Sequence, residues 1–294
     1  MQSKPKILVT GANGQLGQEF RDLAISNTEF DFIFLSKEQL SIQKIDEVKI
    51  CFEKFKPQYC INCAAYTQVD KAEQEIELAF QINATAVGFL SSVCQAFNTN
   101  FIHISTDYVF DGTANIPYKE NTSTNPVSIY GSSKLEGEKL AFQNNINTIF
   151  IRTSWVYSSF GKNFVKTMLK LMGEKNEVAV VNDQLGSPTY AFDLAEVIIQ
   201  IISKSHSKIV SWQPGIYNFS NNGIISWCDF ATAIKEISKA TCILNPVSTA
   251  EFPTIAIRPA YSVLDKEKII SVFGIQLKDW RDSLKRCLSK IEKL

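Results

Sequence analysis

The chain has 294 residues, 30 basic and 30 acidic side chains, and a hydrophobic fraction of 45%. This length and apolar content suit one large domain or two unequal ones and argue against disorder. The net charge of zero gives no overall field for a phosphate polymer or an anionic membrane. The lysines are scattered among acids without a basic patch, so we expect no nucleic-acid partner.

Compartment and cysteine usage point to the cytoplasm. The first apolar run, residues 7–9, is too short for a signal peptide, and no apolar stretch approaches the roughly 20 residues of a transmembrane helix. The seven cysteines are dispersed and odd in number, as expected of reduced thiols. Cys60 and Cys63 form a C-x-x-C pattern, but no second ligand pair accompanies it, so we interpret both as buried and inert.

Short apolar runs alternate with longer amphipathic stretches through the first half, as in βαβ units. The predicted strands are residues 6–10, 32–35, 59–62, 100–105, 148–152 and 178–181. The predicted helices are residues 15–23, 48–55, 75–97, 128–142 and 163–171. The pattern predicts an α/β fold of Rossmann type, a doubly wound parallel sheet with helices on both faces.

After about residue 182 the alternation loosens and prolines interrupt shorter elements. The predicted helices here are residues 193–202, 226–239 and 277–292, and the predicted strands are residues 215–219 and 241–244. We therefore expect a dinucleotide-binding domain over residues 1–182 and a smaller substrate-binding lobe over residues 183–294, with later segments able to return to the first domain.

A glycine-rich loop follows the first predicted strand and has the spacing G-x-x-G-x-x-G. The first glycine permits a tight turn, the second a close approach to a pyrophosphate, and the third close packing of helix on strand. The start of the next helix offers free N–H groups and the positive end of its dipole to phosphates. An ordinary strand–helix turn is the alternative. The expected cofactor-binding residues are Gly11, Asn13, Gly14, Gln15, Leu16 and Gly17.

The end of the second predicted strand carries Ser36 and Lys37 where an acid usually binds the adenosine ribose. A serine and a lysine tolerate a 2′-phosphate, which favours NADPH, with NADH also possible. The alternative is that Lys37 is simply solvated in a loop.

Tyr130 and Lys134 are four residues apart and hence on one face of a predicted helix. An ammonium group beside a phenol lowers the pKa of the phenol toward the working range of proton transfer. Thr106 follows a predicted strand, so its hydroxyl emerges at the carboxyl end of the sheet, where such folds bind ligands. The three residues predict a Thr–Tyr–Lys catalytic set.

Only two histidines are present, His103 in an apolar run and His206 in a polar stretch. They exclude a histidine-rich metal site and leave few candidates for a Ser-His-Asp triad. We interpret both as structural.

Several segments together resemble the dTDP-4-dehydrorhamnose reductase family of the extended short-chain dehydrogenase/reductase superfamily. The resemblance runs from residue 6 to about residue 265. Its segments are GANGQLG at 11–17, NCAAYT at 62–67, VDKAE at 69–73, STDYVFDG at 105–112, YGSSK at 130–134, RTSWVY at 152–157, DQLGSPT at 183–189 and RPA at 258–260.

The resemblance implies hydride transfer from NADPH or NADH to C4 of dTDP-4-dehydro-β-L-rhamnose, giving dTDP-β-L-rhamnose in the last step of that biosynthesis. Tyr130 would protonate the developing C4 alkoxide, and Lys134 would lower the pKa of Tyr130 and hold the nicotinamide ribose. Thr106 would hydrogen-bond the reacting oxygen.

The same resemblance assigns further binding residues. Gly14, Gln15 and Leu16 would line the pyrophosphate. The adenine side and the cofactor channel would be formed by Ser41, Ile42, Ala64, Ala65 and Tyr66. The substrate would contact Thr106, Asp107, Trp155 and, as a bidentate diphosphate clamp, Arg258. Trp155 could instead be a core aromatic. The family often has an acid at the position of Ser41 and an alanine at that of Cys63, so this chain departs from the family pattern at the adenine side and in the channel.

The family is also associated with Mg²⁺ at a subunit contact, which allows for a homodimer. We can assemble no carboxylate cluster from the sequence, although Glu19 is one candidate ligand. Three alternatives stay open: a sugar dehydratase, an epimerase or reductase acting on another nucleotide sugar, and a non-catalytic NADP-binding regulatory subunit. The dehydratases place a glutamate after Asp107, where this chain has Tyr108. Fucose-forming epimerases use a Cys and a His, which do not accompany this set, and a regulatory subunit need not keep it intact.

Overall fold

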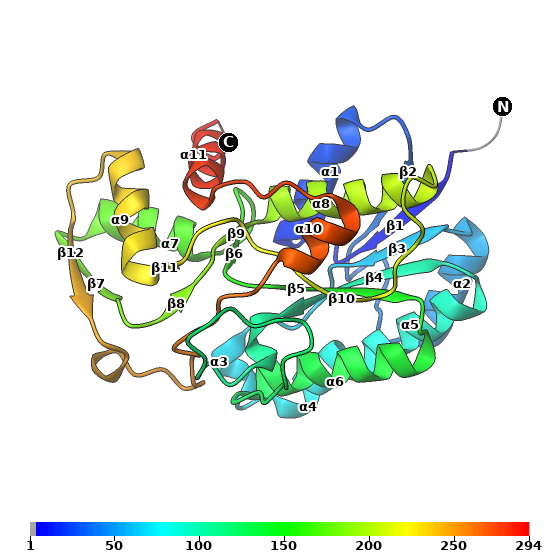
Figure 1. Ribbon diagram of the computed structural model, residues 1–294, viewed down its shortest axis with the longest axis horizontal. Coiled ribbons are helices and arrows are strands. Elements are labelled where there is room, and N and C mark those ends of the chain that lie inside the picture. The colour runs from blue at the N-terminus through cyan, green and yellow to red at the C-terminus, as the bar shows by residue number, and fades with distance from the viewer. Residues whose placement is uncertain (1–3, 294) are drawn as a thin grey trace.

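The computed structural model describes residues 4–293, and a six-stranded parallel sheet forms its centre (Figure 1). The strand order is β10-β5-β4-β3-β1-β2. The strands are β1 (Lys6–Thr10), β2 (Asp31–Leu35), β3 (Tyr59–Asn62), β4 (Asn100–Thr106), β5 (Thr148–Thr153) and β10 (Gly215–Asn218). The chain leaves β1 toward β2 on one side and returns to β3 on the other, so the carboxyl ends of β1 and β3 flank the crevice that binds ligands in such sheets. The predicted α/β fold with a parallel sheet is confirmed.

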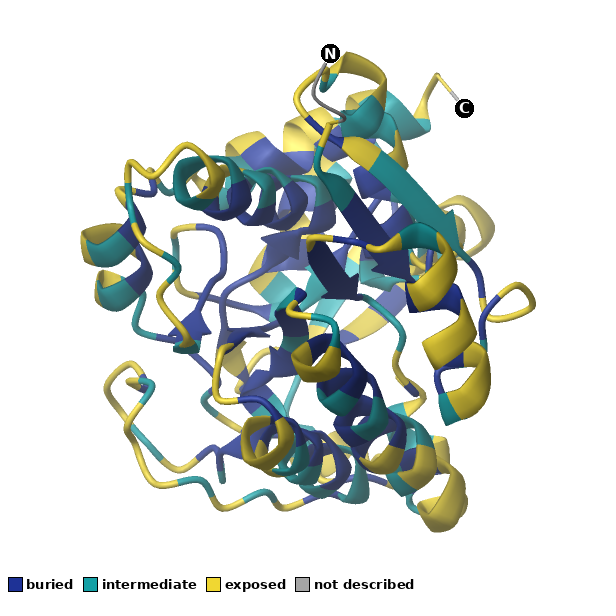
Figure 2. Ribbon diagram, turned by 90° about the vertical axis from the view of Figure 1, so that its right-hand side faces the viewer, coloured by how far each residue is buried: buried dark blue, intermediate teal, exposed yellow. Residues whose placement is uncertain are grey.

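Side chains alternate between the two faces of this sheet. In β1, Ile7 and Val9 pack into one core and Leu8 into the other. The first core is covered by α1 (Gln15–Ser26), α8 (Ala191–His206) and α10 (Glu267–Phe273). The second is covered by α2 (Ile45–Phe55), α5 (Ala86–Ala96) and α6 (Ile129–Asn144). Figure 2 shows the strands buried between these helices, whose outer faces are exposed.

The helix predicted over residues 75–97 is interrupted. It consists of α4 (Ile76–Phe80), a π-helical turn (Gln81–Thr85) and α5. In the π-helical turn, the Asn83 amide accepts a hydrogen bond from the Tyr66 N–H (2.8 Å) and donates to the Ser133 hydroxyl (3.0 Å). The turn thereby ties the loop after β3 to α6.

One helical stretch departs from the expectation about apolar length. Ile76–Ala96 is long and apolar enough to cross a membrane by length and composition alone, so the expectation that no such stretch exists was wrong. Half of its most apolar window is buried inside the fold. It packs against α6 and α2, as a core helix of a sheet layer does.

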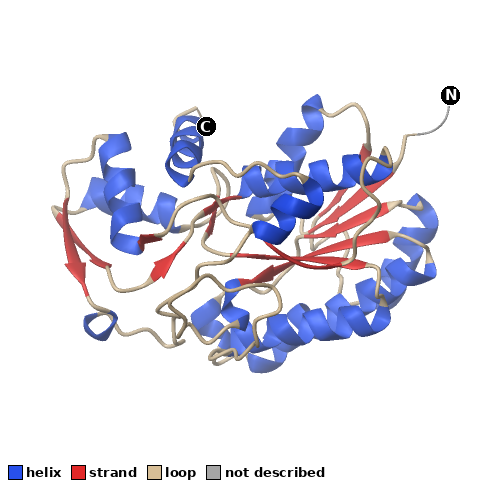
Figure 3. Cartoon of the chain, viewed as in Figure 1, coloured by secondary structure: helices blue, strands red, loops and turns tan. Residues whose placement is uncertain are grey.

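The second lobe has its own core beside the sheet (Figure 3). It contains α7 (Phe164–Glu174), β7 (Glu177–Val181), α9 (Trp227–Ser238), β12 (Ile243–Val247) and α11 (Trp280–Ile291). Short pairs connect it to the rest: β6 (Val156–Tyr157) with β9 (Thr189–Tyr190), and β8 (Leu185–Gly186) with β11 (Ile225–Ser226). The short α3 (Val69–Ala72) and α10 were not predicted.

Two strands exchange the places that we predicted for them. β7 pairs with β12 in the second lobe rather than joining the central sheet, and β10, expected in the smaller lobe, is the edge strand beside β5. The burial pattern gives the reason: β5 is buried at every residue, as a central parallel strand must be, whereas β7 exposes Glu177 and Ala179. The domain boundary at residue 182 stays a prediction. β7, which precedes this residue, pairs in the second lobe, and β10, which follows it, pairs in the central sheet.

Candidate active site

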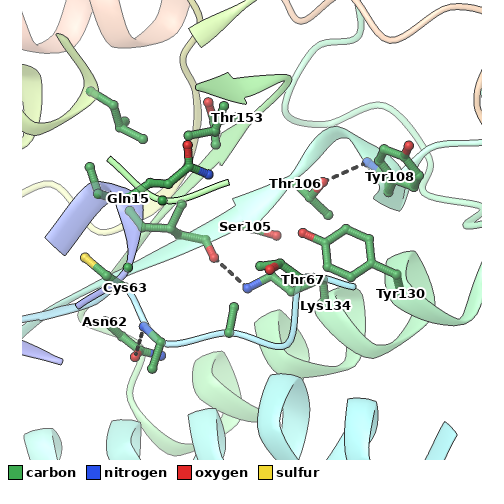
Figure 4. Close-up of a pocket in the computed structure, with 18 of the residues that line it drawn as sticks. Gln15, Asn62, Cys63, Thr67, Ser105, Thr106, Tyr108, Tyr130, Lys134 and Thr153 are labelled. Atoms are coloured by element: carbon green, nitrogen blue, oxygen red, sulfur yellow. Dashed lines mark hydrogen bonds between the residues drawn. The ribbon is translucent and has the colours of Figure 1, made fainter. Parts of the chain in front are cut away.

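A cavity of about 590 Å³ opens at the carboxyl ends of β1, β3, β4 and β5. Figure 4 shows side chains from the sheet, α6 and the connecting loops gathered around it. Of the residues predicted for the site, those that line the cavity are Asn13, Gly14, Gln15, Leu16, Ala64, Ala65, Thr106, Asp107, Tyr130, Lys134 and Trp155. Residues far apart in the sequence therefore meet in one space.

The glycine loop has the geometry that its spacing predicts. Gly11 has a φ of +64°, and a Cβ there would stand 2.6 Å from the Ala64 nitrogen. A Cβ on Gly17 would stand 2.6 Å from the Gly11 oxygen, so the helix packs directly on the loop. Helix α1 begins after Gly14 without a side-chain cap, which leaves its first N–H groups to a ligand. These features fit a dinucleotide pyrophosphate.

The expected adenosine contacts lie outside the cavity lining. Ser36 is buried, and its hydroxyl donates to Glu38 Oε2 at 2.6 Å. The first acid after β2 is thus Glu38, one residue beyond Lys37. Ile42 packs in the core beneath α2 and α5, and neither Ser41 nor Ile42 lines the cavity.

The Thr–Tyr–Lys set is brought together by β4 and α6. Thr106 ends β4, where its hydroxyl donates to Asp107 Oδ1 (2.9 Å) and accepts from the Tyr108 N–H (3.2 Å). Tyr130 and Lys134 occupy the first turns of α6, and Lys134 is only 2% exposed. The Lys134 Nζ donates to the Ile104 carbonyl oxygen at 2.7 Å, a bond drawn in Figure 4.

Burial governs the protonation of this set. It raises the pKa of Tyr130 to about 12, the negative charge on Asp107 adds to the shift, and a hydrogen bond with Thr106 opposes it. Burial lowers the pKa of Lys134 to about 8, against the attraction of Glu138. Burial thus decides the pKa of Tyr130, and the expectation that Lys134 lowers it stays a prediction.

Asp107 is a buried carboxyl group at the cavity wall. Burial raises its pKa to about 7, against hydrogen bonds with Thr106 and Ser262 and from backbone N–H groups. Its Oδ2 atom is buried without a hydrogen-bond partner among residues 4–293. A ligand hydroxyl at this position would satisfy that oxygen.

Trp155 belongs both to the cavity wall and to the second lobe. Its φ is +47°, and its ring stacks on Trp227 with centroids 3.6 Å apart. Gly186 lies against its face, because a Cβ there would stand 2.5 Å from the Trp155 ring. Trp155 therefore fits both interpretations: its ring packs on Trp227 as a core aromatic, and the part of the residue that lines the cavity is available to a substrate.

Two other expected site residues are engaged elsewhere. Arg258 Nη2 donates to Asp70 Oδ2 at 2.6 Å, and Arg258 does not line the cavity. Tyr66 is not among the cavity-lining residues, and its hydroxyl donates to Glu75 Oε2 at 2.7 Å. The structure thus brings neither side chain into the cavity lining.

Glu19 is fully buried and accepts from the Ser158 hydroxyl and from Lys290 Nζ, each at 2.6 Å. It joins α1 to α11 and is not near other ligands: within residues 4–293 no group of three or more His, Cys, Asp or Glu could hold a metal ion. The expectation of Mg²⁺ bound through Glu19 is therefore not supported.

The cysteines are free thiols throughout the part of the chain that the structure describes. Cys60 is buried as expected, but Cys63 is only partly buried and lines the cavity. Burial raises the pKa of both, so both are thiols near neutral pH.

Sequence reasoning missed part of the cavity wall. The further lining residues include Thr67 and Val69 after β3, Thr153 at the end of β5, and Gly161 and Lys162 before α7. Thr153 had a signal, because it ends a parallel strand as Thr106 does. Gly161 and Lys162 had none, since they reach the cavity only through the docking of the second lobe.

A glycine loop before a helix, a Thr–Tyr–Lys set at the carboxyl edge of a parallel sheet, and a second lobe over the cavity define an extended short-chain dehydrogenase/reductase. A family model described as the RmlD substrate binding domain matches residues 5–293. The chain belongs to this family.

Related proteins agree with the family assignment. A dTDP-4-dehydrorhamnose reductase of Aggregatibacter actinomycetemcomitans is 42% identical over 95% of this chain and 97% of that protein. The spore coat polysaccharide biosynthesis protein SpsK of Bacillus subtilis is also 42% identical, over 97% of each chain. The crystal structure of dTDP-4-dehydrorhamnose reductase from Bacillus anthracis in complex with NADP is 36% identical, with a TM-score of 0.91 over 98% of this chain and 100% of that chain.

Proposed function

We propose that this protein reduces the C4 ketone of dTDP-4-dehydro-β-L-rhamnose with NADPH or NADH, giving dTDP-β-L-rhamnose, the last step of dTDP-L-rhamnose biosynthesis. The observation that carries the proposal is the convergence of Thr106, Tyr130 and Lys134 on the cavity that the glycine loop also lines. The name shared by its relatives supplies the substrate.

The site residues divide the chemistry between them. When bound, the reduced nicotinamide supplies the hydride that reaches C4 of the sugar. As the C4 oxygen gains negative charge, the Tyr130 hydroxyl donates its proton to it, so that the ketone becomes an alcohol. Burial keeps Tyr130 protonated at neutral pH, which is the form that a reductase needs. Thr106 would turn its hydroxyl proton from Asp107 Oδ1 to the same oxygen.

Substrate binding would draw on three residues around the cavity. Asp107 Oδ2 has no hydrogen-bond partner within the described residues 4–293 and would bind a sugar hydroxyl, and the free edge of Trp155 would pack on the sugar ring. Arg258 would exchange its ion pair with Asp70 for the substrate diphosphate, to which a guanidinium group binds in a two-pronged fork.

Other activities on this fold are less well supported. The glutamate that sugar dehydratases place after Asp107 is replaced by Tyr108. Epimerisation needs an acid–base pair beside the ring, but the raised pKa of Cys63 keeps it a thiol, and His103 contacts Lys134 instead of lining the cavity. A nucleotide-sugar reductase of different specificity and a cofactor-binding regulatory subunit are distinguished by the assay below.

The test is to supply the 4-keto sugar nucleotide with NADPH or NADH and follow oxidation of the cofactor. Turnover by the wild type and its loss in Tyr130→Phe are expected, while Tyr261→Phe, outside the cavity, serves as the matched control. Cofactor binding without turnover would favour the regulatory subunit. Undiminished turnover by Tyr130→Phe would overturn the assignment of the proton donor.

The choice of cofactor, the compartment and the assembly complete the proposal. Both NADPH and NADH are included, because Glu38 holds the Ser36 hydroxyl beside Lys37 at the end of β2. Relative KM values for the two cofactors decide between them. We place the protein in the cytoplasm, as a possible homodimer, which cell fractionation and light scattering would test.

A further inference from the structure

We propose that His103 is a positioning residue for Lys134: its imidazole, fixed as one tautomer by Asn62, favours the neutral amine of Lys134 over the ammonium form. The inference rests on the proposed function only in assigning Lys134 and Tyr130 to the reaction. It replaces the purely structural role that we expected for His103.

A chain of hydrogen bonds runs under the cavity floor from β1 to α6. The Asn62 Oδ1 atom accepts from the Thr10 hydroxyl (2.6 Å) and from the Ala64 N–H (3.1 Å). The Asn62 Nδ2 atom lies 3.0 Å from His103 Nδ1, and His103 Nε2 lies 3.1 Å from Lys134 Nζ. Apart from the Ala64 backbone, every member of this chain is at most 2% exposed.

The orientation of the Asn62 amide follows from the backbone. Because a backbone N–H can only donate, the atom facing Ala64 must be the side-chain oxygen, and the amide nitrogen must therefore face His103. Figure 4 shows this bond between Asn62 and the following loop. His103 Nδ1 thus accepts a hydrogen bond, and a neutral imidazole with a bare Nδ1 carries its proton on Nε2.

The Nε2–H group of His103 then points at the Lys134 nitrogen. An ammonium group has three donors and no lone pair, whereas a neutral amine can accept the hydrogen bond and still donate to the Ile104 carbonyl oxygen (2.7 Å). Protonation of His103 would not relieve the conflict, because it would add an Nδ1–H group facing the Asn62 amide nitrogen, and burial lowers the pKa of His103 well below its usual value. Only the amine satisfies both contacts.

The other titratable groups around Lys134 do not reverse this preference. Glu138, one turn further along α6, favours the ammonium form, but its carboxylate is bound by Arg152 (2.9 and 2.7 Å) and by the Ser105 hydroxyl (2.5 Å). Tyr130, Asp107 and Cys63 line the same cavity, and burial shifts the pKa of each upward, toward its neutral form.

The neutral amine has a chemical consequence at Tyr130. A cation beside a phenol lowers the pKa of the phenol, whereas a neutral amine does not. Tyr130 therefore stays in the phenol form that can protonate an alkoxide, so the buried chain from Thr10 to His103 prepares the site for reduction.

Nuclear magnetic resonance of ¹⁵N-labelled histidine tests the tautomer directly. The chain has only two histidines, and His206→Gln removes the second signal from a site remote from the cavity. We expect His103 to be neutral with its proton on Nε2 across neutral pH. In Asn62→Asp the carboxylate can only accept, so the proton should move to Nδ1, while Thr10 and Ala64 keep an acceptor.

The titration of Lys134 is the second readout, with its resonance assigned by its loss in Lys134→Arg. In Asn62→Asp the histidine proton leaves Nε2, so the nitrogen that faces Lys134 becomes an acceptor. We therefore expect the acid dissociation constant of Lys134 to fall at least about tenfold, which raises its titration midpoint by about one pH unit. His103→Gln, whose uncharged amide oxygen can face Lys134, should shift it in the same direction without adding a charge.

Two results would overturn the proposal: an Nδ1–H tautomer in the wild type, or a Lys134 midpoint unmoved in a folded variant. The new carboxylate of Asn62→Asp would raise the Lys134 midpoint by its charge alone, so the uncharged His103→Gln decides whether the imidazole N–H lowers that midpoint. Both measurements are made without substrate or cofactor, so their failure leaves the proposed reductase untouched, and a lack of turnover leaves them valid.

Discussion

Replacing Asp107 by asparagine should stabilise the ligand-free protein at alkaline pH. Asp107 is 2% exposed, and burial raises its pKa from the ordinary 3.8 to about 7. A shift of about three units, at ~1.4 kcal/mol each, corresponds to about 4 kcal/mol of lost stability once the carboxyl group ionises. We expect ~2–4 kcal/mol to be recovered in Asp107→Asn, because water penetration reduces the penalty of a buried charge.

The sign is set by proton binding. Between pH 3.8 and about 7 the native carboxyl group holds a proton that the unfolded chain has released. The native state therefore binds more protons, and stability falls as the pH rises through this window. Asp107→Asn should match the wild type near pH 4 and exceed it at pH 8, while the asparagine oxygen still accepts from Thr106. Substrate binding should weaken in the same variant.

Urea unfolding at these two pH values measures the effect, and Asp193→Asn is the matched control. Asp193 is also 2% exposed, but hydrogen bonds from Arg286, Ser283 and Asn221 lower its pKa in spite of burial. Asp193→Asn should therefore destabilise the protein at pH 8, by about 3 kcal/mol. If Asp107→Asn were no more stable than the wild type at pH 8, the carboxyl group would not be desolvated and the reasoning would fail.

Further predictions concern packing, a buried ion pair and linkage. Gly137→Ala should destabilise α6, because its Cβ would stand 2.0 Å from a carbonyl oxygen of the π-helical turn. Gly173→Ala in α7, where a Cβ would meet open space, should instead raise the free energy of unfolding in urea by ~0.5–1 kcal/mol. Lys290→Met should cost about 3 kcal/mol by leaving the Glu19 carboxylate buried without its cation, and adding Glu19→Gln should restore part of the loss. Calorimetry near pH 8, in buffers of different ionisation enthalpy, should record proton uptake on binding of NADPH, because an anion raises the pKa of Lys134, and Lys134→Met should reduce that uptake.

The sequence predicted best what local periodicity and strand ends determine. Strands β1 and β3 were predicted residue for residue, and Thr106, Tyr130 and the glycine loop were found because each stands at a fixed place beside a strand or on a helix face. The sheet membership of β7 and β10 could not be read, since pairing at an edge is decided by contacts across long sequence separations. Arg258 was assigned by its chemistry, yet only the fold places Asp70 within 2.6 Å of it.

Protonation was the property that sequence reasoning judged least well, and burial explains why. The spacing of Tyr130 and Lys134 predicts an acidified phenol if the lysine is charged and the site is wet. Instead, desolvation acts on Tyr130, Lys134 and Asp107 in one direction, toward the neutral form of each. A site with few fixed charges can admit a dinucleotide and a sugar diphosphate without first expelling a resident anion. Because those ligands are themselves anionic, their arrival would favour the ammonium form of Lys134, so that the cation is produced when the tyrosinate that it stabilises is about to form.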